Sequence, residues 1–466
     1  MSPVLPPEPA SASFRDPSGF MFREGGVWLR QVNERYRADY ELLFSSGLYA
    51  ELVAAKRLIA HEELPPREGA WKVLRPEQIG TVSYPYEWSF SQLKDAALVT
   101  LEIQAAALAK GMSLKDATAY NIQFVGGRPV LIDTLSFERL EEGRPWVAYR
   151  QFCQHFLAPL ALMAKTDIRL SQLSRVHIDG VPLDLAVALL PWTTRLNFGL
   201  GLHLHAHAAS QKKHGGGSDT PAALPAKSAA FSKTAFLATI DSLQSAVKGL
   251  DWQPAGTEWA DYYERNNNYG DSGLQEKERA VGAMLDALAP KSVWDLGANT
   301  GRMSRLAAAR GANVVAWDID PACVEANWRQ VVRAGETNVL PLLQDLTNPS
   351  GGIGWAGEER MSVAARGPVD VVMALGLIHH LAISNNVPLD RIAAFFASLG
   401  RAVILEFVPK EDSQVAKLLA TREDIFPTYN RAGFEAAAAR YFDVEAAVDI
   451  PGTCRTLYRL RTRKPA

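Results

Sequence analysis

Three carboxylates and a turn containing glycines stand in order in the second half of this 466-residue chain. Asp295 precedes Gly297 and Gly301 in the segment VWDLGANTG, Asp318 follows in WDID, and Asp345 follows in LQDL. Each acid lies at the end of an apolar run. A glycine turn between a strand and a helix brings backbone close to a ligand. We therefore expect one ligand whose hydroxyl and amino groups donate hydrogen bonds to these carboxylates.

Two ligand classes compete for this turn. A dinucleotide site favours the spacing GxGxxG, whereas here the glycines are spaced G-x-x-x-G and an acid, Asp295, ends the strand. A carboxylate at that point suits an ammonium group, such as that of the methionine part of S-adenosylmethionine. Asp318 can accept from the ribose hydroxyls of either ligand, and Asp345 can accept from an adenine amino group. Asn299 replaces the middle glycine without excluding the site, because asparagine enters left-handed backbone conformations at modest cost.

The elements that must position these residues alternate between short β-branched runs and helical patterns. This rhythm predicts βαβ units and a Rossmann-like parallel sheet with helices on both faces. Two further strands, 442–450 and 454–462, are expected to close the sheet. The expected earlier strands are 292–297, 312–320, 338–346, 369–376 and 401–407, and the helices between them include 302–311, 321–335 and 388–400.

The order of DLGANTG, WDID, LQDL and ALGLIHHL resembles the class I S-adenosylmethionine-dependent methyltransferases from Tyr262 to Arg461. Within that class, DLTNPS, HHLAISNNVPL and EFVPKEDSQV are similar to a nodulation-protein-like subgroup. The resemblance implies that the glycine turn frames the methionine part, that Asp318 binds the ribose and that Asp345 with Leu346 binds the adenine. It also implies that Leu375 offers its backbone carbonyl to the ammonium. The full implied cofactor set is Asp295, Gly297, Asn299, Gly301, Asp318, Ile319, Asp345, Leu346 and Leu375.

Three residues at the ends of the later strands could act on the methyl acceptor. His379 and His380 follow the fourth strand, where the acceptor would bind, and Glu406 ends the fifth. A histidine there could take the acceptor's proton or simply hydrogen-bond a neighbouring loop. The sulfonium is already activated, so alignment of the acceptor supplies most of the rate and the site could work without a base. Asp320, which precedes Pro321, is expected to be a helix N-cap instead of a ligand.

The N-terminal half carries a second set of polar residues, Asp116, Asn121 and Asp133, arranged around a hairpin pattern at 122–132. Their spacing is similar to that of the catalytic loop and the metal-binding aspartate of protein-kinase-like folds, in particular the small-molecule phosphotransferases. That resemblance implies that Asp116 positions an acceptor hydroxyl, while Asn121 and Asp133 hold magnesium with ATP.

The same segment departs from the kinase pattern in several places. Leu114 and Lys115 replace the usual His-Arg or His-Gly pair, and Asp133 is followed by Thr-Leu instead of Phe-Gly. A glycine-rich phosphate loop and a clear strand lysine are both missing from the sequence. A degenerate α+β domain that recognises a substrate or partner is therefore the alternative to a phosphotransferase.

Length and composition indicate several domains. The segment 205–233 is rich in Gly, Ser, Ala, Pro and Lys and predicts a flexible linker. We expect a disordered N-terminus at 1–14, an N-terminal α+β domain at 15–204 and the methyltransferase domain at 234–466. The alternating histidines of HLHAH (203–207) have no second ligand cluster in the sequence, so no metal site is predicted.

The bulk charge and cysteine content restrict the partners. A net charge of −2 gives no electrostatic reason to expect nucleic acid or an anionic membrane. Three separated cysteines form neither a disulfide framework nor a CxxC metal pattern, which fits a reducing cytosol, and no apolar run reaches membrane-span length. A cytoplasmic location is therefore expected.

Three functions remain open from the sequence. The first is a methyltransferase (EC 2.1.1.-) with a substrate-recognition domain. Its acceptor is not identified, and a small molecule is expected in preference to a macromolecule. The second is a bifunctional protein whose N-terminal domain binds ATP and magnesium or transfers phosphate. The third is a non-catalytic, S-adenosylmethionine-binding regulatory protein.

Overall fold

The computed structural model describes residues 10–214, 232–254, 270–420 and 422–463. Most of the predicted disordered N-terminus and residues 215–231 of the predicted linker lie outside these ranges. The chain divides into two units. Unit 1 comprises Met1–Gln253 together with Gly354–Arg360, and unit 2 comprises Pro254–Ile353 together with Met361–Ala466.

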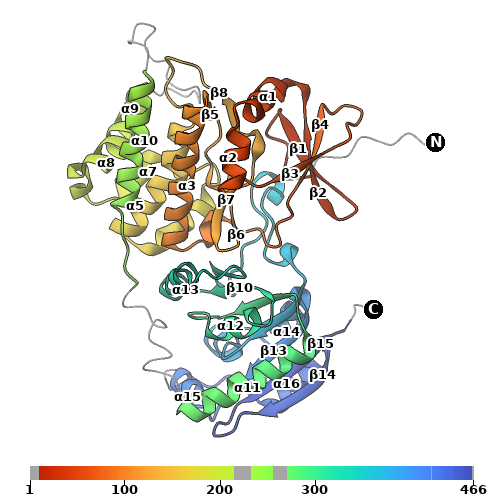
Figure 1. Cartoon of the computed structure of the whole chain (residues 1–466). Coiled ribbons are helices and arrows are strands. Elements are labelled where there is room, and N and C mark those ends of the chain that lie inside the picture. The colour runs from red at the N-terminus through yellow and green to blue at the C-terminus, as the bar shows by residue number, and fades with distance from the viewer. Residues whose placement is uncertain (1–9, 215–231, 255–269, 421, 464–466) are drawn as a thin grey trace. The chain divides into compact units, whose positions relative to one another are not determined.

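Unit 1 begins with a four-stranded antiparallel sheet in the order β1-β2-β4-β3 (Figure 1). Strands β1 and β2 form a hairpin whose turn is made by Gly25 and Gly26, which both have positive φ. Helices α1 and α2 connect the second strand to the third. The bounds are β1 Gly19–Glu24, β2 Val27–Val32, α1 Arg37–Ser45, α2 Leu48–Ala54, β3 His61–Leu64 and β4 Lys72–Pro76.

The remainder of unit 1 is mainly helical. Its long helix α3 (Phe90–Ala109) starts at a capping box, in which the Ser89 side chain accepts from the backbone of Gln92 and the Gln92 side chain accepts in return. The predicted hairpin is present as β6 and β7, and β5 pairs with β8. The bounds are β5 Met112–Leu114, β6 Ile122–Val125, β7 Arg128–Leu131, β8 Phe137–Arg139, α4 Tyr149–Phe152, α5 Ala158–Lys165, α6 Leu173–Val176, α7 Leu183–Leu189, α8 Phe198–Leu200, α9 His207–His214 and α10 Lys233–Lys248.

The division between the units differs from the predicted domain boundary. Helix α9 occupies the first part of the predicted linker, and helix α10 belongs to unit 1. The Lys94 ammonium on α3 donates to the backbone carbonyls of Lys248 and Leu250, at 3.0 and 2.6 Å. Helix α10 carries a buried apolar stripe that needs a packing partner, and unit 1 supplies it. Composition alone could not show which side that stripe packs against.

Unit 2 is built on a seven-stranded sheet in the order β11-β10-β9-β12-β13-β15-β14 (Figure 1). The first five strands are parallel, and β15 is antiparallel to both of its neighbours. The predicted Rossmann-like sheet and its two closing strands are thereby confirmed. The bounds are β9 Ser292–Leu296, β10 Asn313–Asp318, β11 Val339–Leu343, β12 Val369–Ala374, β13 Gly400–Phe407, β14 Phe442–Asp449 and β15 Thr456–Thr462.

Strand β9 lies between β10 and β12, so the strand order reverses direction beside it. In open parallel sheets, ligands bind outside the carboxyl ends of the strands at such a switch point. The residues after β9 and β12 are therefore in the position where this fold places a ligand. The antiparallel strand β15 occupies the sixth position, between β13 and β14. This arrangement differs from the dinucleotide-binding order and is that of class I methyltransferases.

Helices pack against the sheet of unit 2 and bury both of its faces. Val371 and Met373 point to one face and Val372 and Ala374 to the other, and all four are buried. The apolar stripe of α11 packs with Val293 on the first of these faces. The bounds are α11 Gly270–Leu288, α12 Arg302–Ala308, α13 Pro321–Ala334, α14 Leu389–Leu399, α15 Ser413–Leu419 and α16 Arg431–Ala438.

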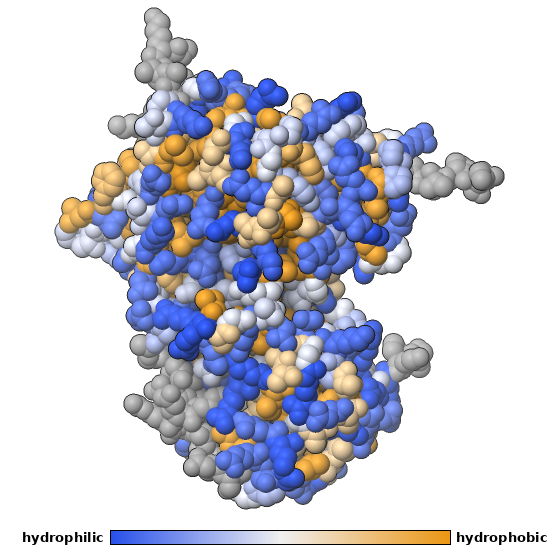
Figure 2. Space-filling model, in the orientation of Figure 1, coloured by the Kyte–Doolittle hydropathy of each residue, from blue (hydrophilic) through white to orange (hydrophobic). Residues whose placement is uncertain are grey.

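The surface is mostly polar, with one concentration of large apolar side chains in unit 1. Trp192, Leu196 and Phe198 are between 70% and 80% exposed. Figure 2 shows apolar side chains on the side of unit 1 where Figure 1 draws α8. Among the helices that the structure describes, none is both long and apolar enough to cross a membrane.

Candidate functional site

The turn after β9 has the backbone conformation that its sequence predicts. Gly297, Asn299 and Gly301 all have positive φ, at 73°, 51° and 79°. The Asn299 side-chain oxygen accepts from the backbone N–H of Thr300 at 2.8 Å, which stabilises the left-handed residue locally. The asparagine therefore keeps the turn intact.

The two glycines of this turn are required for different reasons. A Cβ on Gly301 would lie 2.5 Å from the amide nitrogen of Asn327 on α13, so close packing inside the protein demands glycine there. A Cβ on Gly297 would meet only the Leu377 side chain, at an ordinary 3.4 Å. At Gly297 the requirement comes from the positive φ alone.

Asp318 joins two turns at the carboxyl edge of the sheet. One carboxylate oxygen accepts from the backbone N–H of Asn299 at 2.7 Å, and the other accepts from that of Asp320 at 2.9 Å. Burial raises the pKa of Asp318 to about 6, against the lowering effect of these hydrogen bonds. The backbone N–H of Ile319 also hydrogen-bonds this carboxylate, whose remaining acceptor capacity is available to a ligand hydroxyl.

Asp295 is buried at the end of β9 and accepts from the Ser304 hydroxyl at 2.6 Å. Burial raises its pKa to about 6. Ser304 and Lys277 act in the opposite direction, and Asp318 adds to the rise. Two partly protonated acids therefore lie at the switch point, and a cation or hydroxyl donor would favour their ionised forms.

The remaining predicted cofactor residues lie along the same edge. Asp320 caps α13 through the Ala322 N–H, as predicted. The side chain of Ile319 is 54% exposed, and Leu346 and Leu375 are half-buried. One Asp345 oxygen accepts from both the N–H and the hydroxyl of Thr347, at 2.8 and 2.6 Å.

Gln344, which sequence reasoning missed, has a buried amide oxygen without a hydrogen-bond partner in the described part of the chain. Its backbone N–H donates to the carbonyl of Asp318 at 2.7 Å, which places it at the cofactor edge. A buried, unpaired acceptor costs free energy unless a ligand donates to it. The sequence signal was its position directly after β11, beside the predicted Asp345.

His379 and His380 follow the turn after β12, with ring centroids 4.1 Å apart. His379 is 3% exposed, and its Nδ1 has no hydrogen-bond partner among the described residues. Burial, followed by His380, Arg455 and Lys277, holds the pKa of His379 well below its usual value. Burial and Arg455 lower the pKa of His380 to about 4. Both imidazoles are thus neutral near pH 7, and the lowered pKa values make them weak bases, which opposes the predicted role in taking a proton from the acceptor.

Glu406 is part of a buried chain of four charged side chains. It is fully buried, with the Lys277 ammonium 2.8 Å from one oxygen and the Arg455 guanidinium 3.6 Å from the other. Arg455 also donates to Asp412 through Nε and a terminal nitrogen, at 2.7 and 3.1 Å. The Glu406 carboxylate contacts both cations at once and is therefore suited to positioning Lys277 and Arg455.

The sequence analysis did not find Lys277, Arg455 or Asp412. They come from three segments distant in sequence, and only the folded sheet brings them together. One local signal existed. Lys277 stands on the apolar stripe of α11 between the buried Leu274 and Val281, where a lysine requires a buried partner.

In unit 1 the structure brings together the three polar residues that the sequence selected. Asp116 accepts a hydrogen bond from the Asn121 side chain, and burial followed by the charge of Asp133 raises the pKa of Asp116. The Asn121 amide donates to the Ser136 hydroxyl at 3.1 Å, and that hydroxyl donates to Asp133 at 2.9 Å. The predicted cluster therefore exists as a hydrogen-bonded group.

A cation that the sequence analysis did not identify lies beside this group. The Arg30 guanidinium on β2 is 2.9 Å from the Asp133 carboxylate, and both side chains are 14% exposed. Strand β2 thus presents an arginine to this acid. That contact neutralises a carboxylate that would otherwise be available to a metal ion.

The segment Gly354–Arg360, from the connection between β11 and β12, folds as part of unit 1. Arg15 makes a bidentate ion pair with the buried Glu359, in which Nε and a terminal nitrogen donate to the two carboxylate oxygens at 2.9 and 2.7 Å. The Arg360 guanidinium lies 4.2 Å from the ring centre of Tyr120, the residue before Asn121. This segment is therefore anchored next to the polar group of unit 1.

The histidines of HLHAH make ordinary internal hydrogen bonds. His203 bonds to the Tyr149 hydroxyl at 2.7 Å and to Ser242 at 2.9 Å, and His205 bonds to Thr194 at 2.8 Å. Within the described ranges, no group of His, Cys, Asp and Glu side chains could hold a metal ion. The three cysteines are free thiols.

The sequence is similar to one curated protein over nearly its whole length. It is 36% identical over 465 residues to nodulation protein NoeA of Rhizobium meliloti (strain 1021), covering 97% of this chain and 96% of that protein. The chain belongs to the NoeA family of nodulation proteins. No family model matches the sequence.

Three solved structures of methyltransferases are similar to part of this NoeA-family chain. The bifunctional kinase-methyltransferase WbdD matches with a TM-score of 0.31 and 17% identity, over 47% of this chain and 46% of its own, which is less than half of WbdD. The N-methyltransferase NodS of Bradyrhizobium japonicum WM9 matches with a TM-score of 0.31 and 9% identity, over 42% of this chain and 99% of NodS. Magnesium protoporphyrin IX methyltransferase of Synechocystis PCC 6803 matches with a TM-score of 0.30 and 24% identity. The match covers 44% of this chain and 98% of that methyltransferase. The assignment of the fold rests on the strand order of unit 2.

Proposed function

We propose that this protein is an S-adenosylmethionine-dependent methyltransferase whose unit 2 binds the cofactor and transfers its methyl group to a small-molecule acceptor. The observation that carries the proposal is the pair of buried acids, Asp295 and Asp318, at the switch point of the sheet. Both have a pKa raised to about 6, so a ligand that donates to them recovers part of the cost of their burial.

The residues at this edge fit the chemical groups of the cofactor. Asp318 suits the ribose hydroxyls, and Asp295 with the Leu375 carbonyl suits the ammonium of the methionine part. The unpaired oxygen of Gln344 supplies an acceptor for the adenine amino group, in addition to Asp345. Lys277 is the buried cation beside Asp295 and Glu406, and we assign it to the carboxylate of the methionine part.

The bound cofactor would supply an activated methyl group, so the protein's own residues have mainly to orient and to exclude water. The neutral His379 and His380 would orient the acceptor by hydrogen bonds, because their lowered pKa values make them weak bases. Glu406 is a positioning residue, because it fixes Lys277 and Arg455 while both of its oxygens are engaged. Unit 1 would recognise the substrate.

A second candidate function concerns unit 1. The clustering of Asp116, Asn121 and Asp133 favours a site for ATP and magnesium. The ion pair between Arg30 and Asp133 opposes it, because a neutralised aspartate is a poor magnesium ligand. Substrate recognition by a degenerate kinase-like domain is therefore the preferred role.

The test of the methyltransferase proposal is transfer of a labelled methyl group from S-adenosylmethionine into a fractionated cell extract. The unmodified protein should label a product, and Asp318→Ala should reduce labelling roughly 10- to 100-fold, because charged hydrogen bonds to the cofactor are lost. Asp443→Ala, an exposed acid on β14, is the control and should label normally. Equal labelling by Asp318→Ala, or no labelled product, would contradict the proposal.

A further inference from the structure

A group of large apolar side chains projects from the surface of unit 1. Trp192 and Leu196 lie on the short 3-10 helix η7 (Trp192–Leu196), and Phe198 is the first residue of α8. These three side chains are 70%, 77% and 80% exposed, so neighbouring residues cover little of them. Leu202 follows four residues after Phe198 on the π-helix η8 (Gly201–Ala206) and is also exposed. We call these four residues the η7–α8 patch, which lies where Figure 2 shows apolar side chains over α8.

Hydrogen bonds within unit 1 hold the patch in place. The Thr194 hydroxyl bonds to the His205 ring at 2.8 Å, which ties η7 to η8. The Asn197 side chain accepts from the backbone N–H of Leu200 at 3.0 Å and caps α8. The backbone N–H groups of Thr194, Asn197 and Gly201 donate to carbonyls of the same segment. The polar groups beneath the patch therefore have internal partners, a condition that favours apolar surroundings.

The segment that carries the patch is basic, although the whole chain has a net charge of −2. Residues 185–218 contain Arg195, Lys212 and Lys213 and no acid. Arg195 is exposed and directly precedes Leu196. Helix α10, which packs against α8, adds two exposed lysines and one exposed aspartate. An apolar surface with a basic surround favours an anionic, amphipathic partner.

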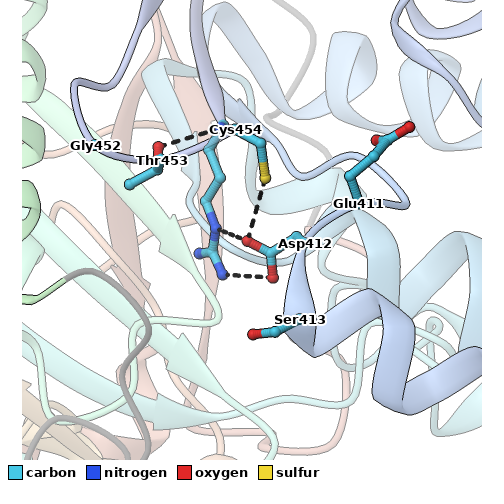
Figure 3. Close-up of a pocket in the computed structure, with 7 residues that line it drawn as sticks. Glu411, Asp412, Ser413, Gly452, Thr453 and Cys454 are labelled. Carbon is cyan, nitrogen blue, oxygen red and sulfur yellow. Dashed lines mark hydrogen bonds and ion pairs between the residues drawn. The ribbon is translucent and has the colours of Figure 1, made fainter.

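A second copy of the chain would need an apolar recess to receive the projecting side chains. Figure 3 shows a surface hollow of unit 2, which is lined by residues 411–413 and 452–455. Its lining, as far as the structure describes it, contains no aliphatic or aromatic side chain. That hollow is therefore a poor partner for Trp192 or Phe198. A lipid bilayer needs no recess of matching shape, because its acyl chains adapt to the side chains that enter.

We propose that the η7–α8 patch docks unit 1 on the surface of a bilayer that contains anionic lipids. Trp192, Leu196 and Phe198 enter the boundary between headgroups and acyl chains, where aromatic side chains are favoured. Arg195 stays at the level of the headgroups and contacts lipid phosphate. This interaction surface is independent of the proposed methyl transfer.

The test is co-flotation of the full-length protein with lipid vesicles. One set is phosphatidylcholine alone, and the other is phosphatidylcholine with phosphatidylglycerol in a 7:3 molar ratio. Leu196→Ser/Phe198→Ser removes two side chains of the patch. Val176→Ser/Trp355→Ser is the matched control, because these side chains are 73% and 74% exposed and lie outside the patch. Arg195→Gln tests the charge, and all substituted positions are exposed, so the melting temperature should be unchanged.

We expect the unmodified protein and the control to float with the mixed vesicles. Leu196→Ser/Phe198→Ser should weaken this binding at least about tenfold. Arg195→Gln should weaken binding to the mixed vesicles about fivefold and leave binding to phosphatidylcholine unchanged.

Four outcomes would overturn the proposal. The first two are no flotation of the unmodified protein and full binding by Leu196→Ser/Phe198→Ser. The third is an equal loss in the control, which would mean that exposed apolar area in general causes flotation. The fourth is a dimer in sedimentation that Leu196→Ser/Phe198→Ser abolishes, because a second copy would then occupy the patch.

Discussion

The Lys277 ammonium lies 2.8 Å from a carboxylate oxygen of Glu406, and neither side chain is more than 5% exposed. This pair joins α11 to the carboxyl end of β13, next to Asp295 and His379. Burial of two charges is costly, and the attraction between them repays the cost only with good geometry. The pair lies at the switch point of the sheet, the place where open α/β sheets bind ligands.

Replacement of Lys277 should lower the affinity for one of two ligands that differ in their amino-acid part and leave the affinity for the other unchanged. Lys277→Met should weaken the binding of S-adenosylhomocysteine roughly 10- to 100-fold, because the methionine-type carboxylate loses a charged hydrogen bond. The binding of 5′-methylthioadenosine, which has no carboxylate, should be unchanged. Calorimetric titration of both ligands measures the difference.

The control for this experiment is Lys291→Met, which removes an exposed lysine before β9 and should leave both affinities intact. An equal loss for both ligands in Lys277→Met would mean that Lys277 only supports the fold. An unchanged affinity for S-adenosylhomocysteine would remove Lys277 from the cofactor site.

Glu406→Gln should destabilise unit 2 more than a surface substitution does. The change leaves Lys277 and Arg455 buried without their shared carboxylate, and breaking a buried ion pair costs about 3–5 kcal/mol. Urea unfolding followed by tryptophan fluorescence measures the change. Glu423→Gln, at an exposed position, should have almost no effect. Equal stability of the two variants would show that the buried charges do not depend on Glu406.

Cofactor affinity should depend on pH around 6. Asp295 and Asp318 each have a pKa raised from 3.8 to about 6 by burial, and the ligand requires their ionised forms. Affinity for S-adenosylhomocysteine should therefore fall below pH 6, by about tenfold per pH unit for each acid and so by up to about a hundredfold for both, and level off above 7. Titrations between pH 5 and 8 would show this slope, and a flat profile would exclude both acids from the site.

The same shifts predict the opposite trend for the stability of the ligand-free protein. The folded state binds the two protons more tightly than the unfolded state, since its pKa values are higher. The contribution to stability is fully present below pH 3.8 and is lost as the pH rises through 6. The free energy of unfolding of unit 2, measured with a denaturant at pH 5 and pH 7, should include a larger contribution from these two acids at pH 5. Asp318→Asn should reduce that gain, and an unaltered gain would contradict the assignment.

Glu359→Gln should loosen the segment Gly354–Arg360. The variant removes one charge of the ion pair with Arg15 while the glutamine remains buried, and the exchange of backbone amides at Gly357–Arg360 should become faster. Glu358→Gln changes the exposed neighbour and is the matched control. Unchanged exchange in Glu359→Gln would show that Arg15 does not anchor the segment.

Magnesium and ATP should not raise the melting temperature of the protein, because Arg30 already neutralises Asp133. A thermal shift assay with and without magnesium-ATP checks this expectation. An increase of several degrees that is abolished by Asp133→Asn would contradict it and would support the bifunctional alternative.

Local patterns were sufficient to predict the sheet of unit 2 and its turn. The left-handed Asn299, the N-cap Asp320 and the clustering of Asp295 with Asp318 at strand ends all follow from residue type and from position relative to the apolar runs. Each of these features depends on a few neighbouring residues or on the regular geometry of parallel strands.

Features that depend on contacts distant in sequence were not predictable in the same way. Lys277, Glu406 and Arg455 meet only after the sheet has formed, and nothing in the local sequence pairs them. The helix α10 was assigned to the second domain because its apolar stripe does not indicate its partner. The insertion of 354–360 into unit 1 likewise depends on Arg15, which is far away in the chain.

Titration of S-adenosylhomocysteine into the unmodified protein and Asp318→Asn at pH 7.5 tests the central claim most directly. The proposed cofactor site predicts saturable binding by the unmodified protein at one site per chain. It also predicts affinity at least about tenfold weaker in Asp318→Asn. No binding by the unmodified protein, or equal affinity in the variant, would contradict the placement of the cofactor at the carboxyl edge of β9 and β10.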